Sequence, residues 1–151
     1  MSELETKGTL EAKSKPVAPA RLLLAEDDFE LRELLAYVLR ADGHDVVEAR
    51  DGHDLLRILS ESAQRGTASE PFALVVSDVR MPGLTAFDVL TRLQRTLRDT
   101  PVILITAFGD QTTHLRAHRL GACRVFDKPF DFDDLRAAVD ETLHQRRLRA
   151  S

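Results

Sequence analysis

The segment from Phe72 to Gly83 constrains the fold more than any other part of the sequence. It reads Phe-Ala-Leu-Val-Val-Ser-Asp and then Val-Arg-Met-Pro-Gly, so an apolar stretch leads directly into Asp78 and a turn. An unbroken apolar stretch of this length, bounded by turn residues, is typical of a strand buried on both faces of a parallel sheet. In open parallel sheets, ligands bind beside the carboxyl ends of the strands. Asp78 is therefore predicted at the mouth of a crevice, where a carboxylate can react or bind a cation.

Four further apolar stretches predict four more strands. They cover residues 21–25, 44–49, 101–106 and 123–127. Between the strands, apolar residues recur three and four positions apart, as on one face of a helix. In the first such segment they are Leu31, Leu34, Leu35, Val38 and Leu39. Strands that alternate with helices favour right-handed crossovers and a parallel sheet covered on both faces. We therefore predict an α/β fold with a five-stranded, doubly wound parallel sheet, a flavodoxin-like (βα)5 three-layer sandwich, with a polar loop over residues 60–71.

The length of 151 residues predicts one domain. Residues 1–20 are polar and end in a proline-containing stretch, so we expect a disordered lead-in, followed by a domain over residues 21–149 and no output domain. No apolar run approaches the ~20 residues that a membrane-spanning helix needs. The single cysteine, Cys123, excludes an internal disulfide and is predicted to be a small buried hydrophobic residue, which is compatible with the cytoplasm.

The formal net charge of −4 argues against general affinity for nucleic acid. Arg146, Arg147 and Arg149 are interpreted as cations that balance the dipole of the last helix rather than as DNA contacts. His114 and His118 are four residues apart on a predicted helix, but they lack a third ligand, so a solvated face is expected there.

Polar side chains follow each of the buried strands. They are Glu26-Asp27-Asp28 after the first strand, Asp78 after the third, Thr106 at the end of the fourth, and Asp127-Lys128 at the end of the fifth. In a parallel sheet these ends share one edge, and crowded carboxylates repel one another unless a cation lies among them. Oxygen ligands suit Mg²⁺. A carboxylate can also accept a phosphoryl group, while a lysine and a hydroxyl contact its oxygens.

These residues resemble those of a known family. Four short motifs at the strand ends look like those of the receiver domain of bacterial two-component response regulators. They are Glu-Asp-Asp after the first strand, Asp-Val-Arg-Met-Pro-Gly after the third, Ile-Thr-Ala after the fourth and Lys-Pro-Phe after the fifth. The resemblance covers about residues 21–145.

The resemblance implies a role for each of these positions. Asp78 would accept the phosphoryl group from a sensor histidine kinase, with Thr106 and Lys128 responding to it. The Mg²⁺ ligands would be Glu26, Asp27, Asp78 and the backbone carbonyl of Arg80, with Asp28 just outside the set. Pro129 would follow a cis peptide bond. Phosphorylation would switch a partner-binding face made of the fourth helix, the fifth strand and the fifth helix, and this reading leaves homodimer formation through that face open. Membrane and nucleic-acid partners are not expected.

Two positions depart from the family pattern. The aromatic residue that the family switches is replaced by Val125, and Phe126 lies one position later, on the opposite face of the strand. Arg80 places a long cation beside Asp78. The sequence does not indicate whether this cation lengthens or shortens the lifetime of the phosphoryl group.

Two other functions remain as alternatives. A receiver-like docking module would bind partners without accepting phosphate, and Val125 leaves room for this. A phosphatase that forms an aspartyl phosphate would need a second acid where this chain has Arg80, so we expect a phosphoryl acceptor rather than a turnover enzyme. If Asp78 were only a turn residue, its own position would be explained, but the polar groups at the neighbouring strand ends would not.

Overall fold

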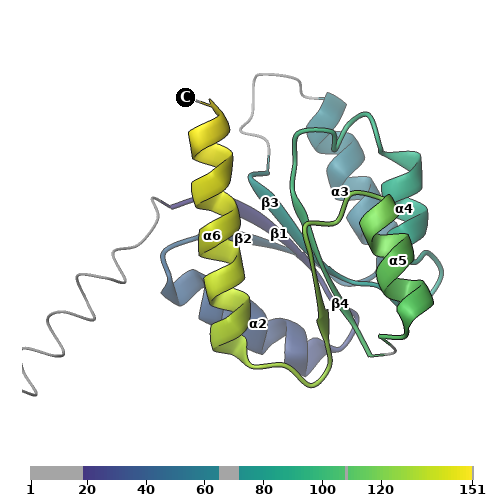
Figure 1. Cartoon of the computed structure of the whole chain (residues 1–151), viewed down its shortest axis with the longest axis horizontal. Helices are drawn as coiled ribbons and strands as arrows, with labels where there is room; N and C mark the ends of the chain where they lie inside the picture. Colours follow the sequence, from purple (N-terminus) through teal and green to yellow (C-terminus); the bar gives the residue numbers. More distant parts are fainter. Residues whose placement is uncertain (1–18, 65–71, 108, 151) are drawn as a thin grey trace, which may run out of the picture.

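The computed structural model describes residues 19–64, 72–107 and 109–150. Strands and helices alternate along this part of the chain, as Figure 1 shows. The strands are β1 (Arg21–Ala25), β2 (Asp45–Ala49), β3 (Leu74–Asp78), β4 (Val102–Thr106) and β5 (Arg124–Asp127). The helices are α2 (Phe29–Ala41), α3 (Gly52–Gln64), α4 (Ala86–Arg92), α5 (Gln111–Arg119) and α6 (Phe132–Ala150).

The strands form one parallel sheet in the order β2-β1-β3-β4-β5. This confirms the predicted fold class. The order reverses beside β1, because β2 lies on one side of it and β3 on the other. At such a reversal the connections leave β1 and β3 toward opposite faces of the sheet, which opens a crevice at the carboxyl ends of the two strands. Glu26 and Asp78 occupy those two ends.

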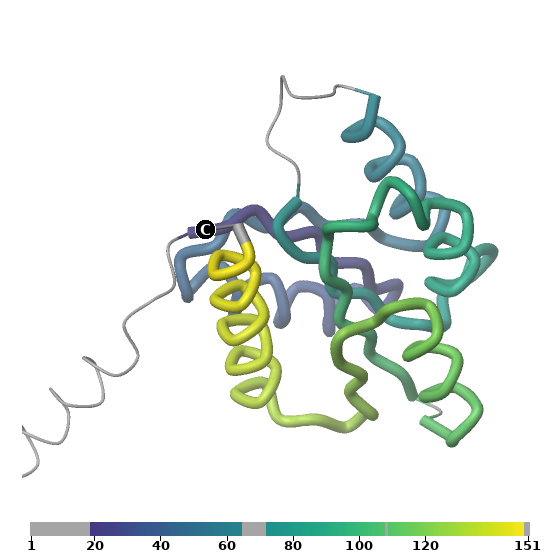
Figure 2. The backbone as a smooth tube through the Cα atoms, turned by 45° about the horizontal axis from the view of Figure 1, so that its top comes forward, coloured from purple at the N-terminus to yellow at the C-terminus, as the bar shows by residue number. Residues whose placement is uncertain are grey.

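Two hydrophobic cores lie on the two faces of the sheet. One face is covered by α2 and α6, and the other by α3, α4 and α5. The central strands β3 and β4 are buried along their whole length, as expected for strands covered on both faces. The rotated view in Figure 2 shows α6 and α5 on either side of β5.

The adjacent residues Val125 and Phe126 contribute to different cores. Val125 packs against the core under α3, α4 and α5, whereas Phe126 is buried in the core under α2 and α6. The rings of Phe126 and Phe130 are 5.8 Å apart. Alternation along β5 therefore separates the two side chains as the sequence predicted.

The buried face of α2 differs from the prediction. The helix buries Arg32, Leu35, Ala36 and Leu39, while Leu34 is 53% exposed. The apolar residues occupy more than half of the helix circumference, so their spacing alone does not say which side meets the sheet. Arg32 bonds Glu48 of β2 and the carbonyl of Glu26, and Ala36 packs into the core, so this side of the helix faces the sheet and Leu34 lies on the solvent side.

Two other local predictions were wrong. Residues 60–64 belong to α3 rather than to a loop, because Leu59 still anchors the helix in the core; residues 65–71 lie outside the described part of the chain. Cys123 is exposed, because it precedes β5 at the open end of the edge strand. The predicted lead-in also falls outside the described residues up to position 18.

Candidate phosphoryl-acceptor site

The acidic pair lies directly after β1. The Glu26 side chain is buried at 1% exposure, and the Asp27 side chain is exposed. The peptide N–H of Asp28 donates to Glu26 Oε2 at 3.1 Å, and Asp28 itself caps α2 by accepting from the N–H of Leu31. The acid pair thus faces the crevice, while Asp28 serves the helix.

Asp78 ends β3 and lies across the crevice from the acid pair. Its side chain is buried, and the N–H of Arg80 is directed at its Oδ1 at 3.4 Å. Carboxylate oxygens of Glu26, Asp27 and Asp78 all lie within 4.8 Å of one another. The structure therefore brings together the three acids that the sequence predicted to meet.

Lys128 lies between two of these acids. Its Nζ is 3.0 Å from Glu26 Oε1 and 3.0 Å from Asp78 Oδ2. The peptide bond between Lys128 and Pro129 is cis, which confirms that prediction. The backbone N–H of Lys128 donates to the carbonyl of Thr106 at 2.8 Å.

Thr106 is fully buried at the end of β4, the strand that pairs with β3. Its neighbour in the β5 register is Asp127, next to Lys128. The five predicted side chains, Glu26, Asp27, Asp78, Thr106 and Lys128, therefore lie along one edge of the sheet. The Arg80 side chain is exposed just beyond this group.

The electrostatics of the site follow from this crowding. Burial raises the pKa of Glu26, and the nearby charge of Asp78 raises it further. Burial also raises the pKa of Asp27, with the adjacent Glu26 adding to the effect. Burial by itself lowers the pKa of Lys128, but hydrogen bonds to Asp78 and Glu26 outweigh it and leave that pKa raised. The site therefore holds more negative charge than one ammonium can balance.

The donor set fits a hard divalent cation. Carboxylate oxygens are the ligands that Mg²⁺ prefers, and an exposed member such as Asp27 leaves space for the waters that Mg²⁺ retains. A cation would also relieve the repulsion that raises the pKa values of Glu26 and Asp27.

The contacts of two side chains near the site were missed by the sequence analysis. The buried Arg32 donates from Nη1 to the carbonyl of Glu26 at 2.8 Å and from Nε to Glu48 Oε1 at 3.3 Å. His114, expected on a solvated face, lies with its Nε2 2.9 Å from Asp127 Oδ1. The only sequence signal for Arg32 was its place beside Leu31 in the first helix, while nothing local indicated the pairing of His114.

A comparison with family models identifies this arrangement. The model described as "Response regulator receiver domain" matches residues 22–140. The chain belongs to this family. Solved structures of receivers share its fold. A response regulator receiver domain protein from Clostridium thermocellum has a TM-score of 0.75 and 26% identity over 85% of this chain and 98% of its own. The response regulator TrrA from Thermotoga maritima, solved in complex with Mg²⁺-BeF, has a TM-score of 0.68 and 26% identity over 82% of this chain and 98% of its own.

Relatives of this receiver differ in length. It is 35% identical over 127 residues to the transcriptional regulatory protein GlrR of Escherichia coli K12, covering 84% of this chain but only 27% of that protein. It is 30% identical over 123 residues to sporulation initiation phosphotransferase F of Bacillus subtilis 168, covering 82% of this chain and 93% of that protein. The receiver thus spans about a quarter of one relative and nearly all of the other.

None of the helices in residues 19–64, 72–107 and 109–150 combines the length and the apolar character that crossing a membrane requires.

Proposed function

We propose that this receiver is phosphorylated on Asp78 by a sensor histidine kinase in a cytoplasmic two-component system. The observation that carries the proposal is the position of Lys128 Nζ, 3.0 Å from Asp78 Oδ2, inside a cluster of carboxylates. An attacking carboxylate must meet a phosphoryl group that is itself negative, so nearby positive charge is required.

In this proposal Asp78 is the nucleophile. A carboxylate oxygen of Asp78 forms the new O–P bond while the N–P bond of the donor phosphohistidine breaks and its electron pair stays on the ring nitrogen. Lys128 provides a compact charge for the phosphoryl oxygens, and the Thr106 hydroxyl donates a hydrogen bond to one of them. Receiver domains are regulatory phosphoryl acceptors, and hydrolysis of the acyl phosphate resets the domain.

The proposed Mg²⁺ ligands are Glu26, Asp27, Asp78 and the backbone carbonyl of Arg80. Asp27 would bind the ion directly, and Glu26 would bind it through water. Once bound, the ion supplies positive charge that stabilises the transferring phosphoryl group. The Mg²⁺-BeF complex of TrrA supports this assignment, because beryllofluoride stands in for a phosphoryl group.

The proposed output is a change in a partner-binding face made of α5, β5 and α6. Thr106 ends β4, and Asp110 caps α5 four residues later by accepting from the N–H of Thr113. Movement of Thr106 toward a phosphoryl group would therefore pull on the start of α5. This coupling biases two conformations of the face and needs no aromatic side chain at Val125.

The central test is phosphorylation with acetyl phosphate and Mg²⁺. Intact-protein mass spectrometry should show one added phosphoryl group that hydroxylamine removes, as expected of an acyl phosphate. Asp78→Asn should abolish the adduct, and Asp45→Asn, a matched change on the exposed edge strand, should keep it.

The same experiment separates the alternatives. Steady release of phosphate from a phosphomonoester would favour a phosphatase. No adduct with any donor, together with no Mg²⁺ binding, would favour a docking module. Retention of the adduct in Asp78→Asn would contradict the assignment of the nucleophile.

The output is tested with beryllofluoride. Analytical ultracentrifugation of loaded and unloaded protein measures whether the active state dimerises. A pull-down with both forms identifies a partner that reads the α5–β5–α6 face, and identical partners and mass in both forms would contradict the proposed switch.

A further inference from the structure

Asp127, the last residue of β5, connects that strand to the start of α5. Its Oδ1 lies 2.9 Å from Nε2 of His114, which belongs to the first turn of α5. A carboxylate can only accept hydrogen bonds, so Nε2 carries the hydrogen in this pair. Both side chains are partly exposed. The contact therefore ties the N-terminal end of α5 to the edge strand of the sheet.

The same carboxylate also lies against Gly109, two residues before α5. A Cβ atom at position 109 would collide with Oδ1 of Asp127. The backbone comes this close to the carboxylate only because glycine has no side chain. Asp127 thus contacts both the helix, at His114, and the connection that leads from Thr106 to the helix, at Gly109. We call the three residues Gly109, His114 and Asp127 the loop latch.

A backbone hydrogen bond lies beside the loop latch, on the side of the acid cluster. The N–H of Lys128, the residue after Asp127, donates to the carbonyl of Thr106 at 2.8 Å. Thr106 and Asp127 are also neighbours in the register of β4 and β5. Thr106, whose hydroxyl is proposed to meet the phosphoryl group, is therefore held next to the latch.

The order of the strands sets the direction in which the latch acts. β4 lies between β3, which carries Asp78, and β5, which carries Asp127. When Thr106 and the residues after it move toward a phosphoryl group on Asp78, they move toward β3 and away from β5. This movement draws Gly109 and His114 away from Asp127. The latch therefore opposes the change that phosphorylation is proposed to cause.

We propose that the loop latch stabilises the resting conformation of this receiver and so limits the fraction that is active. This inference rests on the proposed function of Asp78 and Thr106. Breaking the latch destabilises the resting conformation alone, so the equilibrium moves toward the active one. Asp127 and His114 are positioning residues, because they act through Thr106.

The first test measures the Kd for beryllofluoride in the presence of Mg²⁺, followed by amide NMR signals. Asp127→Ala and His114→Ala should each lower this Kd by about two- to tenfold, the factor that one hydrogen bond of this kind contributes. His118→Ala removes an exposed histidine one turn further along α5 and should leave the Kd unchanged. Damage to the fold would raise the Kd, so a lower Kd separates the latch from a purely structural role.

Gly109→Ala tests the latch from its other side. The added methyl group must displace the Asp127 carboxylate, which breaks the pair with His114, so the Kd should again fall. In the Asp127→Ala background the methyl group meets no carboxylate, and Gly109→Ala should then change the Kd little. Such non-additivity is expected of residues in direct contact.

The second test uses the protein without beryllofluoride. Hydrogen exchange measured residue by residue follows the amide of Lys128, because its bond to Thr106 opens when the connection to α5 leaves β5. His114→Ala should lower the protection of this amide by about two- to tenfold, and His118→Ala should not change it.

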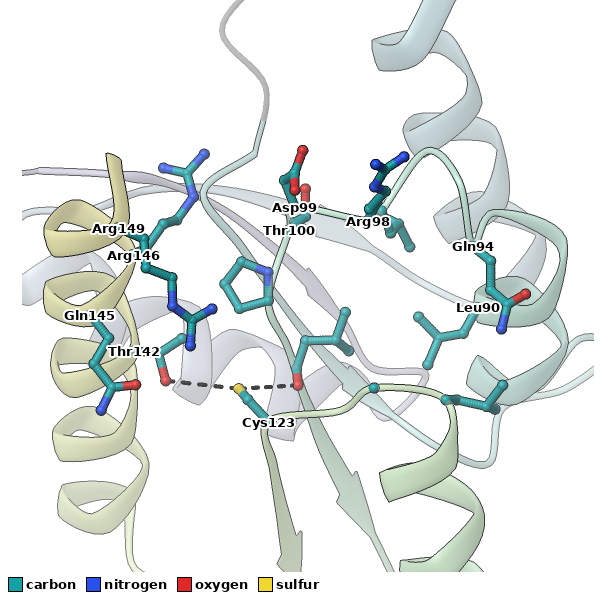
Figure 3. Close-up of a pocket in the computed structure, with 15 residues that line it drawn as sticks. Leu90, Gln94, Arg98, Asp99, Thr100, Cys123, Thr142, Gln145, Arg146 and Arg149 are labelled. Carbon is teal, nitrogen blue, oxygen red and sulfur yellow. Dashed lines mark hydrogen bonds between the residues drawn. The ribbon is translucent and has the colours of Figure 1, made fainter. Parts of the chain in front are cut away.

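An internal control lies at the opposite end of the same two strands. There the N–H of Cys123 donates to the Val102 carbonyl at 2.9 Å, and Figure 3 shows Cys123 in contact with Thr142 of α6. Exchange of the Cys123 amide should be the same in wild type and His114→Ala, because the latch lies at the other end of β5.

The two tests distinguish failure of the latch from failure of the proposed function. An unchanged or higher Kd in His114→Ala and Gly109→Ala, with normal binding by wild type, would overturn the latch and leave Asp78 as the acceptor. If the wild type bound no beryllofluoride, the proposed function and the regulatory role of the latch would both be overturned. His114→Ala changes only a partly exposed side chain, so the tests decide the matter even where Asp127→Ala fails to fold.

Discussion

Val125 and Phe126 are adjacent in β5 but are separated by the sheet, since each packs into a different hydrophobic core. Phe126 therefore cannot act in place of an aromatic side chain at position 125. It is 8% exposed and lies against Phe130.

This separation predicts different consequences for the two side chains. Phe126→Ala should lower the free energy of unfolding by about 3–5 kcal/mol, because it leaves a cavity among packed rings. Val125→Ala removes less buried surface and should cost less, and it should leave the rate of phosphoryl uptake by Asp78 unchanged. Urea unfolding and the acetyl phosphate assay measure the two effects. A large loss of uptake in Val125→Ala would show that position 125 takes part in the switch.

Lys128 is expected to stabilise the folded protein when no cation is bound. Lys128→Ala leaves Glu26 and Asp78 buried without their counter-charge and should cost about 1–3 kcal/mol. Added Mg²⁺ should recover part of this loss, measured as a rise in Tm. Arg136→Ala breaks an exposed pair with Asp42 and should cost less, with no recovery from Mg²⁺. Equal recovery in both variants would contradict a cation site at the acid cluster.

Arg32 is expected to position the acid pair. Arg32→Met keeps the apolar stem but removes the donor to the Glu26 carbonyl and leaves Glu48 without one of its partners, so stability should fall by about 2–4 kcal/mol. Phosphoryl uptake should also slow, because the peptide that carries Glu26 loses its anchor.

The matched control for this prediction is Arg40→Met. Arg40 pairs with the same Glu48 and donates to the carbonyl of Val46, but it makes no contact with Glu26. It should lower stability without changing uptake under conditions where both variants are folded. If both variants slowed uptake alike, Arg32 would have no specific role at the site.

His44 predicts a loss of stability in mild acid. Its ring is buried, and Nδ1 accepts a hydrogen bond from the N–H of Ala20 at 3.2 Å. Burial lowers the pKa of His44, and the positive charge of Arg147 lowers it further. The negative charges of Asp140 and Asp42 raise this pKa but do not outweigh burial. The unfolded chain, with a pKa near the usual value of about 6.5, therefore binds the proton first. Stability that is present above about pH 6.5 is lost as the pH falls through that value.

The measurement is urea unfolding of wild type and His44→Gln at pH 8 and pH 5.5. Between pH 8 and pH 5.5 the wild type should lose more of its free energy of unfolding than His44→Gln does. The slopes of the two free energies against pH should differ by at most about 1.4 kcal/mol per pH unit. Asp140 is present in both proteins, so its own titration cancels to first order. Parallel pH profiles would contradict the role of His44.

The sequence by itself determined the strands, their alternation with helices, and the residues at the strand ends. Apolar runs that end in Asp78 and Thr106 have few ways to bury themselves other than in a parallel sheet, and a parallel sheet brings its carboxyl ends to one edge. The stop at Gly43 and the caps at Thr85 and Asp110 also depend on short-range chemistry, so the local sequence is enough to specify them.

Only the tertiary structure decided which side of α2 is buried, that Cys123 is exposed, and that Arg32 reaches the Glu26 carbonyl. It also decided the pairing of His114 with Asp127. Each of these depends on how far a side chain lies from residues distant in the sequence. The packing of helices on a twisted sheet sets those distances, and the periodicity of a single segment carries no information about them.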